Sequence, residues 1–90
     1  MDHLTIYEEY NVDDYIGKPV ARDIRFKDKN GETYLLTIFH NKTLCITYPS
    51  RRTYMRVSAL DIEANKPELN QIDPTFESWL KTQLQSHYDL

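Results

Sequence analysis

The dipeptide Asn30-Gly31 lies between two runs rich in apolar residues, and this arrangement constrains the fold of the chain more than any other feature. Before the dipeptide, Ile24 and Phe26 alternate with charged residues, which is the period of a half-buried strand. Asn-Gly between two such runs is the strongest short-range signal for a β-hairpin. The middle of the chain therefore predicts antiparallel strands.

Further strands follow this hairpin. Residues 32–40 are apolar on both faces, which is typical of a central strand, and residues 43–48 alternate again. Residues 41–42 and 49–52 have the composition of turns, and residues 53–59 read as one more strand. We predict a four-stranded antiparallel β-meander over about residues 20–59.

Loop length decides which side chains share a face of this meander. Directly opposed residues share a face, and a slip of one residue reverses every side chain. If all three loops contain an even number of residues, one face collects a coherent apolar set, whereas an odd loop between the second and third strands would break the agreement. The core face predicted in this way carries Val20, Ile24, Phe26, Leu35, Phe39, Leu44, Ile46, Tyr48, Met55 and Val57.

The C-terminal region predicts a helix that covers this core. Asp73 is a good N-cap, and Pro74 suits the first helical position. The apolar residues that then recur at helical spacing are Phe76, Trp79, Leu80, Leu84 and Tyr88. We expect an amphipathic helix over about residues 74–88, packed on one face of the sheet, and a loop over residues 65–72. The fold class is α+β in a single domain, residues 1–90.

The same register predicts a second face with apolar, aromatic and basic side chains. Exposed apolar patches mark interaction sites, and Tyr and Arg dominate the binding energy of many interfaces. Arg52, Tyr54 and Arg56 alternate, so an extended strand projects them on one side. The candidate partner-binding residues are Arg25, Tyr34, Leu36, Ile38, Arg52, Tyr54 and Arg56.

Charge is unevenly distributed along the chain, whose net charge is −3. Residues 1–17 hold five acidic and no basic residues, and residues 18–56 hold nine Lys or Arg against three acids. Residues 57–90 hold six acids and two Lys. Three occupants of the second face remain open: residues 1–17 folded back over it, another protein or a second copy of the chain, and a nucleic acid.

No motif in the sequence requires catalysis. The chain has two glycines and no phosphate-binding loop, and no metal-ligand spacing joins its histidines to Cys45. One cysteine excludes an internal disulfide. No apolar run approaches the about 20 residues that span a membrane, and the acidic N-terminus does not resemble a signal peptide. We therefore expect a cytoplasmic protein without cofactor or metal.

We predict a small non-catalytic binding or regulatory protein that acts by binding another protein, as an inhibitor or adaptor of the kind that phages and mobile elements carry. The alternative is a nucleic-acid-binding module, in which bases stack on Tyr34 and Tyr54 while arginines contact phosphates. A remote alternative is a small ribonuclease toxin that uses His40 with Arg52, Tyr54 and Arg56. The acidic pI of about 5.5 argues against both.

Overall fold

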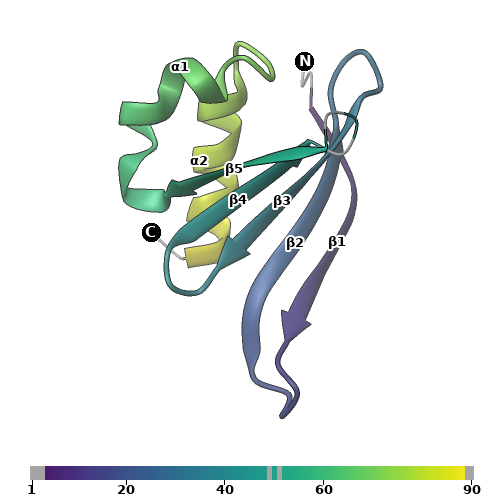
Figure 1. Cartoon of the computed structure of the whole chain (residues 1–90), viewed down its shortest axis with the longest axis vertical. Helices are drawn as coiled ribbons and strands as arrows, with labels where there is room; N and C mark the ends of the chain where they lie inside the picture. The colour runs from purple at the N-terminus through teal and green to yellow at the C-terminus, as the bar shows by residue number, and fades with distance from the viewer. Residues whose placement is uncertain (1–3, 49, 51, 89–90) are drawn as a thin grey trace.

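One antiparallel sheet of five strands forms the body of the protein (Figure 1). The computed structural model describes residues 4–48, 50 and 52–88. The strands lie in chain order: β1 (Thr5–Asp13), β2 (Pro19–Lys27), β3 (Thr33–Phe39), β4 (Thr43–Tyr48) and β5 (Thr53–Ser58). The predicted antiparallel meander is confirmed, but the predicted count of four strands is wrong because residues 5–13 add an edge strand.

Strand β1 pairs with β2 and extends the sheet, so these residues lie beside β2 and not over the face of the sheet. Most of its side chains are exposed, which explains why the sequence of this strand shows no apolar alternation. An edge strand is held by backbone hydrogen bonds and cross-strand pairs to a single neighbour. Here Glu9 pairs with Arg22, and a Glu8 oxygen lies 3.6 Å from Nε of Arg25. Part of the charge asymmetry of the chain is thus satisfied internally.

The hairpins on both sides of β3 contain odd loops. In the first, the Asp28 N–H donates to the Glu32 carbonyl across residues 29–31, and Gly31 has a φ of 82°. In the second, the Lys42 N–H donates to the Phe39 carbonyl, and Lys42 has a φ of 73°. Both are three-residue loops that end in a left-handed residue. An odd loop on each side turns β3 over relative to both of its neighbours.

The inversion of β3 corrects the predicted core. Leu35 and Phe39 were expected in it, but they face away, and Tyr34, Leu36 and Ile38 take their place. The two odd loops offset each other, so β2, β4 and β5 keep the predicted faces. The buried sheet residues of the hydrophobic core are Ile24, Phe26, Tyr34, Leu36, Ile38, Leu44, Ile46 and Val57.

Helix α2 (Phe76–Tyr88) covers this core, as predicted from its spacing. Phe76, Leu80 and Leu84 are buried, and the Trp79 ring lies 4.7 Å from that of Phe26. The side chain of Asp73 accepts a hydrogen bond from the Thr75 N–H at 2.8 Å, as an N-cap does. Regular helix begins two residues after the predicted start. The side chain of Tyr88 lies outside the described part.

The connection between β5 and α2 is helical from residue 59, where the capping pattern of Ser58 and Asp61 offers a short helix as the alternative to strand, and it stays helical beyond residue 65. It holds 3-10 turns at Ala59–Asp61 and Glu63–Asn65 and the short helix α1 (Lys66–Leu69), where the sequence predicted a loop over residues 65–72. Ile62 and Leu69 are buried in the core, which is why this segment folds against the sheet. In the turn predicted at residues 49–52, residues 49 and 51 lie outside the described part. The described helices thus lie on one face of the sheet (Figure 1).

Candidate protein-binding face

The side of the sheet opposite α2 is not covered by any described element, and we call it the open face (Figure 1). Cross-strand pairing places its side chains in rows that run across the strands. One row consists of Glu8, Arg25, Leu35, Thr47 and Tyr54. The next consists of Tyr10, Asp23, Thr37, Cys45 and Arg56. A third contains Val12, Ala21 and Phe39, and beside them Thr43 and Ser58.

The open face carries aromatic rings at both edges and apolar side chains on its central strand. Tyr54 on β5 is 63% exposed, and Tyr10 on β1 is 41% exposed. Leu35 and Phe39 lie between them on β3 and are half-buried. Tyrosines that present a ring and a hydroxyl to solvent are typical of protein interfaces. This face therefore combines apolar area with polar groups that can bond to a partner.

Charges of opposite sign lie at opposite edges of the open face. Arg25 is beside β1, where a hydrogen bond with Tyr10, more than the charge of Glu8, raises the pKa of its guanidinium. Arg56 on β5 is exposed and forms no ion pair with a described residue. The β1 edge is consequently acidic and partly neutralised, whereas Arg56 at the β5 edge has no carboxylate partner within the described part of the chain.

The structure places the predicted site residues in two groups. Arg25, Tyr54 and Arg56 lie on the open face, and Arg52 is exposed in the turn before β5 with a φ of 52°. The other predicted site residues are Tyr34, Leu36 and Ile38, and their exposed fractions are 4%, 0% and 0%. Their placement on an accessible face is wrong because β3 is inverted, so Leu35 and Phe39 occupy the positions expected for them.

The turn between β1 and β2 presents two apolar side chains that are not among the predicted site residues. Tyr15 is 99% exposed and Ile16 is 72% exposed, at the end of a hairpin that projects beyond the other strands (Figure 1). Asp14 holds this turn, because its carboxylate accepts hydrogen bonds from the N–H groups of Ile16 and Lys18, both at 2.9 Å. Gly17 in the left-handed region was the available sequence signal.

His40 lies on the opposite side of the sheet from Tyr54 and Arg56. Its ring centroid is 5.4 Å from that of His87, which belongs to α2. The constellation proposed for a ribonuclease is therefore not assembled. Among the residues that the structure describes, no group of three or more His, Cys, Asp or Glu side chains has the arrangement of a metal site.

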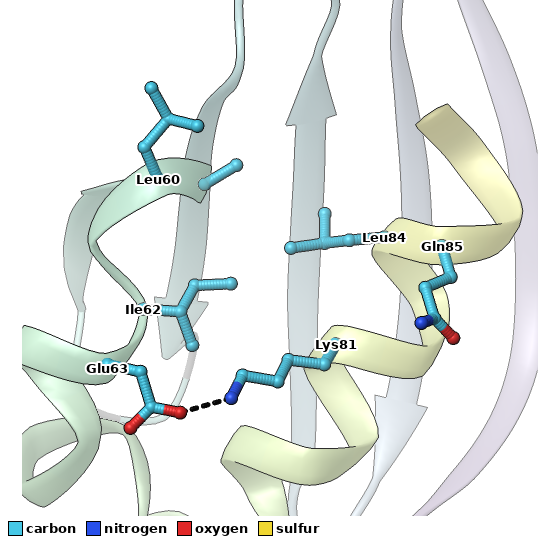
Figure 2. A pocket seen from close by; sticks show the side chains of 7 residues that line it. Leu60, Ile62, Glu63, Lys81, Leu84 and Gln85 are labelled. Atoms are coloured by element: carbon cyan, nitrogen blue, oxygen red, sulfur yellow. Dashed lines mark hydrogen bonds and ion pairs between the residues drawn. The ribbon is translucent and has the colours of Figure 1, made fainter. Parts of the chain in front are cut away.

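A shallow pocket of about 290 Å³ lies on the helical side, between the segment after β5 and α2 (Figure 2). Ile62 and Leu84 point toward each other across it, and Leu60 also lines it, with 82% of its surface exposed. Lys81 is paired with Glu63 and, at 2.7 Å, with Glu77. The charge of Lys81 is thus neutralised by these two carboxylates. The volume of the pocket is at the low end of the range for small-molecule sites.

Comparison with known proteins identifies no relative. No family model matches the chain. Searches among curated proteins and solved structures find no significant match. Within the described residues, none of the helices is long and apolar enough to span a membrane. The function must therefore be argued from the surface of the protein itself.

Proposed function

We propose that the protein is a non-catalytic binding protein that regulates another protein, as an inhibitor or adaptor. It binds this partner through its open face. The observation that carries the proposal is Tyr54, which is 63% exposed beside Arg56 on a sheet face that no described element covers. Tyr and Arg contribute most to binding energy at protein interfaces. Leu35 and Phe39 supply the apolar centre that such a contact needs.

The hairpin turn at Tyr15 and Ile16 supports the same function. Hydrogen bonds to Asp14 order the backbone of this turn, so less backbone freedom is lost when a partner closes around the two side chains. Acidic Asp13 and Asp14 precede these two residues, which disfavours an anionic membrane surface as the target.

A nucleic acid is the weaker alternative for the open face. Tyr34 is buried, so the base-stacking pair of Tyr34 and Tyr54 is lost. Glu8 and Asp23 lie on the same face as Arg56 and reduce its positive potential. Binding to nucleic acid would weaken steeply with added salt, whereas binding through tyrosine and leucine anchors would change little.

A differential pull-down tests the proposal. The chain, the double variant Tyr54→Ala/Arg56→Ala and the control Leu60→Ala are immobilised and exposed to host lysate, with and without nuclease treatment. Leu60 is 82% exposed but lies away from the open face, so its truncation is a matched surface change. We expect at least one protein to be retained by the wild type and the control and lost by the double variant.

Two results would contradict this proposal. One is a set of retained proteins identical for all three baits, which would show that Tyr54 and Arg56 take no part in binding. The other is retention that disappears on nuclease treatment, which would assign the face to nucleic acid. Protection of Cys45 from a thiol reagent by the purified partner gives an independent readout, because Cys45 is the sole cysteine and lies on the open face.

A further inference from the structure

We propose that a second copy of the chain occupies the open face, with the two sheets packed face to face about a two-fold axis that runs along β3. This inference rests on the proposed function, because it takes the open face to be a protein interface, and it names the occupant. A regulated partner would then compete with the second copy for the same side chains.

Symmetry leaves two ways to stack the sheets with their strands aligned. Sheets that pack face to face lie about 10 Å apart with their strands within about 30° of each other. The two-fold axis lies between them and runs either along the strands or across them. Because β3 is the central strand of five, an axis along β3 places β1 of each copy over β5 of the other. An axis across the strands places every strand over its own copy.

The charges on the open face favour the axis along β3. In that arrangement the strand with Glu8 and Tyr10 lies opposite the strand with Arg56 of the partner subunit. The rows stay aligned about this axis, so Arg56, which forms no ion pair with a described residue of its own chain, faces Tyr10 of the partner subunit, and the carboxylate of Glu8 of the partner subunit lies in the adjacent row. The other axis stacks each edge strand on its own copy, which sets the acidic β1 edge against itself and Arg56 against the strand that carries Arg56 of the partner subunit. Like charges placed opposite each other disfavour that arrangement.

The apolar side chains of β3 coincide with this axis. Leu35 and Phe39 lie on the central strand, so each meets the same residue of the second copy, as residues on a two-fold axis do. Thr37 lies between them in register and leaves room for both. Leu35 and Phe39 of the two copies form the centre of the interface, from which water is excluded. The tyrosines and charged side chains of β1 and β5 form its rim.

The area suits a reversible dimer. Five strands spaced about 4.8 Å apart, with three or four outward residues each, present roughly 400–500 Å² of flat surface. Protruding side chains increase the accessible area, which brings the total toward about 1,200 Å², the lower limit of stable specific interfaces. A dimer of this size dissociates on dilution, which leaves the face available to another protein.

Charge reversal tests the arrangement. Sedimentation over a wide range of concentrations measures the dissociation constant of the dimer for the wild type, Glu8→Arg, Arg56→Glu and the double variant. Within one chain, β1 and β5 are separated by four strand spacings, about 19 Å, so residues 8 and 56 interact only between copies. We expect each single reversal to raise the dissociation constant about tenfold or more, and the double variant to restore it to within about threefold of the wild type.

Controls separate this proposal from the proposed function. Leu60→Glu, on the helical side, should leave the dissociation constant unchanged, and circular dichroism shows whether each variant is folded. A mass of 10.7 kDa at every concentration, or single reversals without rescue in the double variant, would overturn the two-fold dimer. A pull-down partner that still depends on Tyr54 and Arg56 would then leave the proposed function standing. A dimer rescued by the double variant, with no such partner, would instead contradict the proposed function alone.

Discussion

His87 lies near the carboxyl end of α2, with its ring centroid 5.4 Å from that of His40 and with Arg22 and Lys42 nearby. Burial is the main cause that lowers the pKa of His87, and the positive charges of His40, Arg22 and Lys42 lower it further. Protonation of this imidazole is therefore disfavoured in the folded protein. The unfolded chain carries no such penalty, so folding and protonation of His87 are linked.

The linkage predicts a loss of stability in mild acid. Between the lowered pKa of folded His87 and the ordinary value of about 6.5, the unfolded chain binds more protons, so the free energy of unfolding rises with pH. The full contribution is present above about pH 6.5 and is lost as the pH falls through the folded pKa. Urea unfolding at several pH values should show a smaller decrease for His87→Gln than for the wild type. Equal decreases in both proteins would contradict the assignment.

At the scale of elements, the two three-residue loops around β3 decide the fold. Each ends in a residue of the left-handed region, Gly31 with a φ of 82° and Lys42 with a φ of 73°. Glycine adopts this conformation without steric cost, whereas a residue with a Cβ is strained by roughly 1 kcal/mol. The β2–β3 hairpin thus has the residue that its turn needs, and the β3–β4 hairpin retains strain.

Relief of this strain should stabilise the protein. We expect Lys42→Gly to raise the free energy of unfolding by about 0.5–1 kcal/mol, because the backbone is already in a conformation that glycine prefers. Lys29→Gly is the matched control, since Lys29 lies in the other loop and does not have a positive φ. It should be neutral or destabilising. Thermal melts of both variants measure the difference, and a lower melting temperature for Lys42→Gly would refute the strain.

At the scale of the whole molecule, one layer of helix covers one face of the sheet. All of the buried sheet residues with large apolar side chains point toward α2, where Phe26 packs against Phe76 and Trp79. The open face contributes less to the core, so its side chains are available for binding at little cost to stability. Side chains of the open face can therefore be substituted without unfolding the protein, and the proposed experiments require this.

Two neighbouring leucines on β3 test which face is covered. Leu36 is fully buried, and Leu36→Ala should lower the free energy of unfolding by about 2–5 kcal/mol. Leu35 is half-buried on the open face, and Leu35→Ala should cost about 1 kcal/mol or less. Chemical denaturation of both variants measures the two losses in the free energy of unfolding. A larger loss for Leu35→Ala would mean that β3 has the opposite orientation.

Local pattern in the sequence determined most of the elements. The alternation in β2 and β4, the Asp73 cap and the helical spacing of Phe76, Leu80 and Leu84 depend only on neighbouring residues, because periodicity and capping are local effects. Strand β1 shows no such alternation, since its side chains are exposed on both faces and pairing with β2 holds it. Its existence depended on tertiary contacts.

The predicted site residues also fall into two groups, those that the sequence placed on the correct face and those whose face only the tertiary structure decided. Arg25, Tyr54 and Arg56 were predicted on the open face because β2, β4 and β5 keep the same relative orientation with two odd loops as with two even ones. Tyr34, Leu36 and Ile38 were misplaced because Asn30-Gly31 suits a two-residue or a three-residue turn, and nothing local marks Lys42 as left-handed. Only burial against α2 decides between these turns, since one additional residue in each loop exchanges the two faces of β3.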